Sequence, residues 1–210
     1  MMSKLLSTFK TISMQLIVAA SLLVSTSLLT SAMATAQDIQ QSNLFPRVKF
    51  VTNHGEMVVE LNRMRAPLTV DNFLRYVVAG DFNNTIFHRM VDDFVVQGGG
   101  FRDGFDPVKT RDAIVNESGN GLKNQFGTIA MARERDPHSA SSQFYFNLKD
   151  NDSLDPSNRR WGYAVFGRIV ENEAVLLELG AVETHTDPDN NYEDVPVEPL
   201  KLLRVELLPR

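Results

Sequence analysis

The residues that could do chemistry in this 210-residue chain include a run of glycines. Gly98, Gly99 and Gly100 are followed by Gly104, which suggests a loop that cradles a phosphate. Such a loop needs a Gly-Lys-Ser/Thr ending that opens a helix, and this ending is missing here. A nucleophile-elbow hydrolase would need Gly-x-Ser-x-Gly, which does not occur either. The sequence therefore argues against both activities.

Metal and thiol chemistry are also disfavoured. The chain has no cysteine, which excludes a catalytic thiol, a cysteine-ligated metal and a disulfide. Four histidines lie far apart without metal-ligand spacing: His54, His88, His138 and His185. The acidic segment 184–198 could bind calcium weakly, but a solvated surface is the favoured interpretation. The net charge is −5 and there is no basic run, which argues against nucleic acid as the main partner. We also expect no cofactor.

Short apolar segments, separated by glycine and asparagine, must position whatever site exists. Helices are expected at 66–80, where Val70, Phe73, Leu74 and Val77 have helical spacing, and at 171–179. Strands are expected at 48–51, 57–61, 86–87, 94–96, 126–131, 144–148, 164–170 and 200–207. Many short strands with two helices predict a mainly β fold, a closed antiparallel barrel with helices over its ends.

The first 36 residues have the pattern of a secretory signal peptide. Lys4 and Lys10 precede the uncharged segment 14–29, and small residues close it at Ala34-Thr35-Ala36. We expect cleavage after Ala36, with a cut after Ala34 as the second choice. An uncleaved membrane anchor is the alternative, but the apolar segment is shorter than the ~20 residues that span a bilayer. The sequence thus predicts a signal peptide (1–36), a polar leader (37–46) and one domain (47–210), located in the periplasm.

Four segments in register carry a resemblance to a known family. They are Phe87-His88-Arg89-Met90-Val91-Asp92-Asp93-Phe94-Val95-Val96-Gln97-Gly98-Gly99-Gly100, Gly127-Thr128-Ile129-Ala130-Met131-Ala132, Ser141-Ser142-Gln143-Phe144-Tyr145-Phe146 and Ala164-Val165-Phe166-Gly167-Arg168-Ile169. Together they resemble the cyclophilin-type peptidyl-prolyl cis/trans isomerases, over roughly residues 48–207. The short loops look most similar to the exported bacterial branch. The resemblance implies an eight-stranded antiparallel barrel capped by two α-helices.

The resemblance also implies a catalytic residue. Rotation about an X-Pro bond breaks amide resonance and crosses a barrier of roughly 18–20 kcal/mol. A donor aimed at the proline nitrogen lowers this barrier, and no nucleophile or metal is needed. In the family that donor is an arginine, and Arg89 matches it. The alternative for Arg89 is an arginine held in a surface ion pair.

Other site residues follow from the same resemblance. The proline ring would contact Phe94, Val95, Tyr145 and Leu154, and the substrate backbone would contact Gln97, Ala132, Arg133 and Gln143. Tyr163, at a position that is His in many eukaryotic relatives, would also contact the substrate. Gln97 and Gln143 could instead brace the loops through an internal hydrogen bond. Tyr145 stands where the family commonly has Phe, so its added hydroxyl should reach solvent or a partner. Ser153 stands where many eukaryotic relatives have a Trp that matters for cyclosporin, and weak cyclosporin binding is therefore expected.

These residues favour an isomerase that accelerates X-Pro rotation while exported proteins fold, acting as a monomer on proline-containing peptides and unfolded exported proteins. One alternative is a chaperone module that binds proline segments with negligible turnover. Another is an interaction partner in an envelope assembly, using the acidic face. Arg89 favours turnover, because binding alone would not require it.

Overall fold

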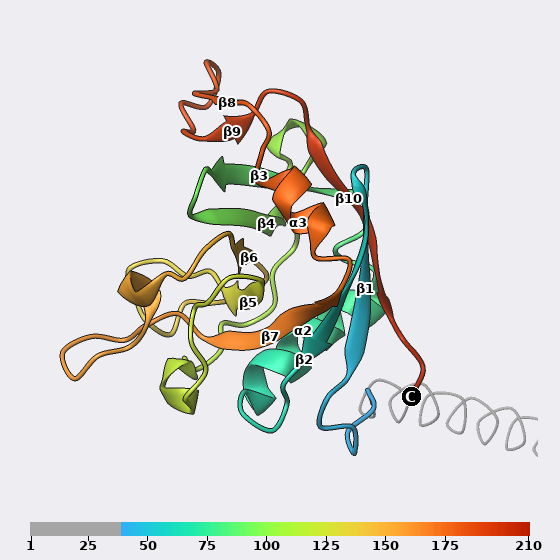
Figure 1. Ribbon diagram of the computed structural model, residues 1–210, viewed down its shortest axis with the longest axis vertical. Coiled ribbons are helices and arrows are strands. Elements are labelled where there is room, and N and C mark those ends of the chain that lie inside the picture. Colours follow the sequence, from blue (N-terminus) through green and yellow to red (C-terminus); the bar gives the residue numbers. More distant parts are fainter. Residues whose placement is uncertain (1–38) are drawn as a thin grey trace, which may run out of the picture. The chain divides into compact units, whose positions relative to one another are not determined.

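The computed structural model describes residues 39–210, and the predicted signal peptide (1–36) lies outside them. Eight strands close into an antiparallel barrel in the order β1-β10-β3-β4-β6-β5-β7-β2 (Figure 1). The barrel strands are β1 (Arg47–Thr52), β2 (Gly55–Leu61), β3 (Thr85–Val91), β4 (Val95–Arg102), β5 (Thr128–Met131), β6 (Phe144–Asn147), β7 (Val165–Glu171) and β10 (Leu200–Leu207). The predicted eight-stranded barrel is confirmed.

Two α-helices and several short elements complete the described part of the chain. Helix α2 (Pro67–Ala79) packs near β10, and helix α3 (Ala174–Leu179) packs near β2. The short elements are the 3₁₀ turns η1 (Asp103–Phe105), η2 (Ser118–Asn120) and η3 (Asp152–Leu154), and a ribbon of β8 (Thr184–His185) and β9 (Val195–Pro196). None of the helices among residues 39–210 is long and apolar enough to cross a membrane.

Helix α2 has the predicted apolar face. Val70, Phe73, Leu74 and Val77 are all buried. The helix stops at Gly80, whose φ of 72° is left-handed and suits a residue without a Cβ. The second helix starts later than the predicted 171. Glu171 is the last residue of β7 and pairs with Val58 of β2. Asn172 has a left-handed φ of 59°, which separates the end of β7 from the start of α3.

Aromatic side chains fill the inside of the barrel. Phe50 of β1 packs against Phe73 of α2 and against Phe144 and Phe146 of β6, with ring centroids 5.2 to 6.1 Å apart. All four side chains are almost completely buried. Because the interior is packed with side chains, it leaves no room for a ligand, and any binding site must lie on the outer surface of this barrel.

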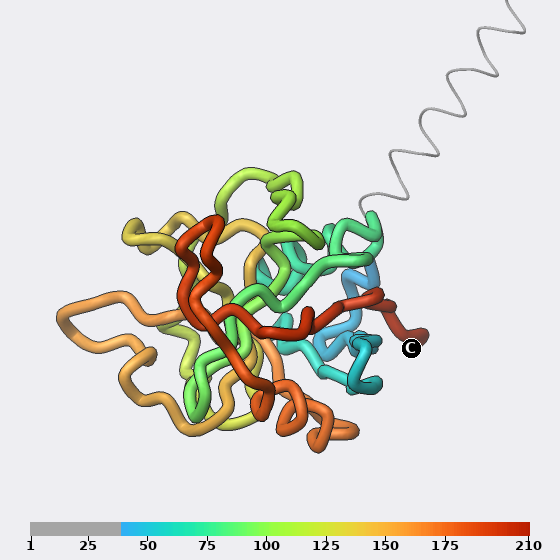
Figure 2. The backbone as a smooth tube through the Cα atoms, turned by 90° about the horizontal axis from the view of Figure 1, so that it is seen from above, coloured from blue at the N-terminus to red at the C-terminus, as the bar shows by residue number. Residues whose placement is uncertain are grey.

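Residues 42–210 form one compact unit, and its two ends lie on the same side of the barrel. β1 pairs with β10, and Figure 2 shows the C-terminal segment beside the start of β1. The last part of the predicted leader is bound here, since Arg63 donates to the backbone oxygens of Asn43 and Leu44 at 2.7 and 3.0 Å.

Candidate functional site

A second apolar cluster lies on the outer face of the strands. Val95, Ala130, Tyr145 and Val165 form it, and the predicted site residues Phe94, Ala132, Leu154 and Tyr163 pack against it with Leu122. Strand alternation explains the separation from the inner core: Phe144 and Phe146 of β6 point inward, so Tyr145 between them points outward. The structure thus brings together six of the residues that the sequence analysis named.

Strand register places Arg89 in line with this cluster. Arg89 of β3 is opposite Gln97 of β4, Gln97 is opposite Tyr145 of β6, and Tyr145 is opposite Ala130 of β5. Directly opposed residues of antiparallel strands share a face, and neighbouring strands are about 4.8 Å apart. The guanidinium, a neutral amide and an apolar surface therefore follow one another across four strands.

Arg89 itself is neither buried nor free. Its side chain is 38% exposed, and its Nη2 lies 3.3 Å from Oδ2 of Asp194. The surface ion pair, which was the alternative prediction for this arginine, is therefore present. The ion pair uses one nitrogen, Nη2, of a guanidinium that has five N–H donors, so other donors remain for a second partner.

Gln97 and Gln143 are joined by a hydrogen bond. Gln97 Nε2 donates to Gln143 Oε1 at 2.8 Å, which is the bracing contact that was weighed against substrate binding. Both side chains also line a hollow of about 260 Å³ together with Ala132, Arg133, Glu134, Ser139 and Ser141. Bracing and an accessible position thus occur together at these two glutamines.

Arg133 covers the end of the apolar cluster. Its guanidinium carbon is 4.6 Å from the ring centre of Tyr163, a cation–π distance. Its nitrogens donate to the backbone oxygens of Glu134 and Trp161, at 2.9 and 3.2 Å. Trp161 itself packs edge-on against His138, with ring centroids 5.1 Å apart, and is not part of the cluster.

The hydroxyl of Tyr145 has a buried partner that sequence reasoning missed. It donates to Asn124 Oδ1 at 2.7 Å, and Asn124 donates to Asp155 Oδ1 from its backbone and side-chain nitrogens, at 2.9 and 3.0 Å. Burial raises the pKa of Tyr145 well above its usual value, so the phenol stays a neutral donor. Burial also tends to raise the pKa of Asp155, but hydrogen bonds from Asn124 and Lys123 outweigh this effect and lower it. The Phe-to-Tyr departure was the one sequence signal that such a partner exists.

The glycine run has a packing role. A Cβ on Gly98 would lie 2.8 Å from the Phe87 ring, and one on Gly99 would lie 2.7 Å from the Phe144 ring. A Cβ on Gly100 would lie 2.7 Å from the Gln143 side chain. The run therefore allows β4 to pass close to the core and to Gln143, which accounts for these glycines without a phosphate.

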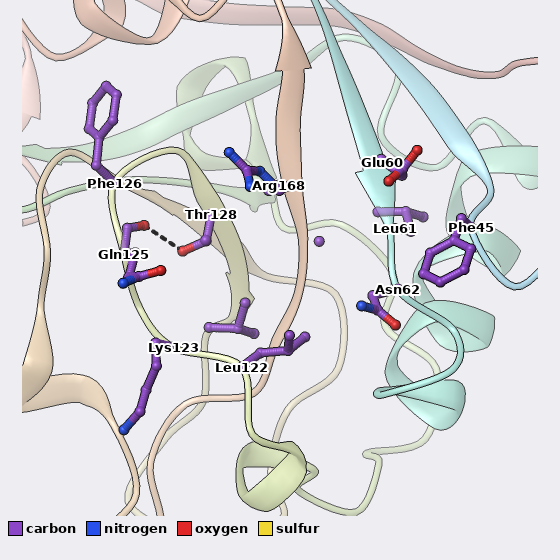
Figure 3. A pocket seen from close by; sticks show the side chains of 12 residues that line it. Phe45, Glu60, Leu61, Asn62, Leu122, Lys123, Gln125, Phe126, Thr128 and Arg168 are labelled. Carbon is purple, nitrogen blue, oxygen red and sulfur yellow. Dashed lines mark hydrogen bonds between the residues drawn. The ribbon is translucent and has the colours of Figure 1, made fainter.

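Another hollow, of about 190 Å³, lies between β2, β7 and the loop that leads to β5 (Figure 3). Side chains of Phe45, Glu60 and Arg168 border it, and it contains none of the site residues named from the sequence. Among residues 39–210, no cluster of three or more histidine, aspartate or glutamate side chains could hold a metal ion.

Comparison with known proteins gives concordant matches. Residues 47–207 match the family model described as cyclophilin type peptidyl-prolyl cis-trans isomerase/CLD. Peptidyl-prolyl cis-trans isomerase B of Escherichia coli is 46% identical over 154 residues, covering 72% of this chain and 93% of that protein. Peptidyl-prolyl cis-trans isomerase cyp18 of Streptomyces antibioticus is 44% identical over 164 residues, covering 77% of this chain and 98% of that protein.

The fold has counterparts among solved structures. A cyclophilin type isomerase of Cryptosporidium parvum, crystallised in the presence of the dipeptide Ala-Pro, superposes with a TM-score of 0.64 at 22% sequence identity. The match covers 78% of this chain and 99% of that one. At this level of identity, the likeness concerns the architecture of the barrel.

Proposed function

The chain belongs to the cyclophilin-type peptidyl-prolyl cis-trans isomerases, and on this premise we propose that Arg89 and the outer apolar cluster isomerise X-Pro bonds in exported proteins. The observation that carries the proposal is the line of side chains Arg89, Gln97, Tyr145 and Ala130 across four strands. A proline ring on the cluster would have its nitrogen within reach of the guanidinium.

Arg89 would act on charge that moves as the bond twists. Loss of amide resonance localises the lone pair on the proline nitrogen, and a donor that is already in place stabilises it without reorganisation. An arginine suits this task because its fork stays charged and needs no proton transfer. No bond is made or broken, so the reaction is complete when the substrate rotates and leaves.

The surrounding residues would hold the two sides of the bond. Phe94, Val95, Tyr145, Leu154 and Tyr163 supply the apolar surface for the ring. The remaining contacts would go to the peptide backbone, from the side chains of Gln97 and Gln143 and from the backbone at Ala132 and Arg133. This arrangement fixes the proline while the preceding residue turns.

We further propose that the substrates are unfolded proteins in the periplasm. The basic start, the uncharged segment and the Ala-Thr-Ala ending of residues 1–36 support export. Cell fractionation and N-terminal sequencing of the expressed full chain test this proposal. A protein that stays in the cytoplasm with its first 36 residues intact would overturn it.

The catalytic proposal is tested by the cis-to-trans rate of an X-Pro peptide with wild type and Arg89→Ala. We expect kcat/KM to fall at least tenfold in the variant, which corresponds to about 1.4 kcal/mol of barrier. Arg168→Ala is the matched control, because Arg168 is an exposed strand arginine beside the other hollow. Equal activity of Arg89→Ala and wild type would refute the role of Arg89.

A further inference from the structure

The acidic segment that precedes β10 is attached to the strand that carries Arg89. Its ribbon of β8 and β9 lies above β3 in Figure 1, and β9 contacts β3. The backbone N–H of Met90 donates to the backbone oxygen of Asp194 at 2.8 Å. The residue next to Arg89 thus anchors the segment, which was expected to be only a solvated surface.

Aromatic contacts hold the tip of the segment. The ring of Tyr192 lies 5.1 Å from the ring centre of Phe105 and 6.2 Å from that of Phe101. Asp187 closes the turn by accepting hydrogen bonds from the backbone nitrogens of Asp189 and Asn190, at 3.0 and 2.8 Å. These contacts hold the segment before Asp194, and the contact of β9 (Val195–Pro196) with β3 holds it after Asp194.

Asp194 directs its carboxylate at Arg89 from this support. Its φ is 60°, a left-handed backbone conformation that aspartate and asparagine adopt more readily than most residues. Oδ2 lies 3.3 Å from Arg89 Nη2, and the two side chains are 37% and 38% exposed. Within residues 39–210, this is the one ion pair that Arg89 makes.

We propose that Asp194 is a positioning residue that holds the Arg89 guanidinium in the orientation needed for X-Pro rotation. This inference rests on the proposed role of Arg89. A long arginine side chain must lose rotational freedom to donate to the proline nitrogen in the twisted transition state, and a carboxylate that already fixes it reduces that loss. The contact uses one Nη, so the other nitrogens stay available to the substrate. Partial exposure limits the strength of the pair, so its loss should cost activity without abolishing it.

The test is Asp194→Asn, which keeps a side chain that tolerates the left-handed backbone and removes the charge. We expect kcat/KM to fall about threefold, mainly through kcat, because the carboxylate acts on the transition state through Arg89. Glu193→Gln is the matched control: Glu193 is an exposed neighbour on the same segment, and its substitution changes the net charge equally. We expect this control to keep wild-type activity.

The same substitution in the Arg89→Ala background separates positioning from a general effect on the segment. If Asp194 acts through Arg89, Asp194→Asn causes no further loss in that background. Three results would overturn the inference: unchanged activity of Asp194→Asn, an equal fall in Glu193→Gln, or the same threefold fall in the Arg89→Ala background. Wild-type activity of Arg89→Ala alone would instead refute the proposed function, so the two failures are distinguishable.

Discussion

Lowering the pH from 7 to 5 protonates histidines in an unfolded chain, and the surroundings of His88 oppose this change in the folded domain. His88 precedes Arg89 on β3, and its ring packs edge-on against Phe101 at 4.9 Å. Its Nδ1 is buried and has no hydrogen-bond partner in the described part of the chain. Burial, followed by the charge of Arg89, lowers the pKa of His88 to about 4, although a hydrogen bond with Gln143 opposes the shift.

The sign follows from the two pKa values. Between the unfolded value of 6.5 and the folded value of about 4, the unfolded chain binds more protons at this site than the folded domain. The contribution of His88 to stability is therefore complete above pH 6.5 and is lost as the pH falls toward 4. From pH 7 to pH 5 this linkage removes about 2 kcal/mol of unfolding free energy.

Urea unfolding at pH 7 and pH 5 measures this effect, with wild type compared with His88→Gln. The variant lacks the titrating ring, so its free energy of unfolding should fall by about 2 kcal/mol less than that of wild type between the two pH values. The carboxylates are the same in wild type and His88→Gln, so their effect on the free energy of unfolding cancels when the two proteins are compared. His185→Gln, which removes an exposed histidine, is the control substitution. An equal loss in wild type and His88→Gln would refute the argument.

Three further predictions concern packing and ligand binding. Gly99→Ala should lower the unfolding free energy by about 3 kcal/mol in urea denaturation, because it adds a steric clash to left-handed strain. Gly104→Ala has a similar φ but free space around its Cβ, and should cost only about 1 kcal/mol; equal losses would show that the clash does not matter. Tyr145→Phe should cost about 1 kcal/mol in the same assay through the lost hydrogen bond to Asn124, while kcat/KM stays within about twofold, and a tenfold fall would contradict this view. Ser153 offers neither an aromatic ring nor an indole donor, so a titration should show cyclosporin binding weaker than about 1 μM, and nanomolar binding would contradict it.

The sequence was sufficient to predict those helices and strands whose own residue pattern determines their structure. Helical spacing of buried residues identified α2, and a glycine marked its end at 80. The predicted strand 200–207 coincides with β10. The start of α3 was wrong because β7 extends through residue 171 to pair with β2, a tertiary contact that no local pattern contains. The β8–β9 ribbon was missed because each of its strands has only two residues.

The site shows the same limit. Arg89 and Phe94 lie in one contiguous motif, so their resemblance to a known family could be seen directly in the sequence. Asp194 and Asn124 were not predicted as site residues, because their partners, Arg89 and Tyr145, come from other parts of the chain. Such contacts depend on how loops fold back over the barrel. The hydroxyl of Tyr145, where the family commonly has Phe, indicates that a hydrogen-bond partner is needed. It does not indicate which residue supplies that partner.

Strand alternation explains how this chain can depart from its family at the site and keep its fold. In β6 the inward residues Phe144 and Phe146 belong to the core, whereas Tyr145 between them belongs to the outer cluster. A hydroxyl added on the outer side needs only a local partner, which the loop at Asn124 supplies. The carboxylate of Asp194 likewise reaches Arg89 from a segment outside the barrel. Loop residues on the outer surface can therefore adjust the proposed catalytic groups while the packed interior stays unchanged.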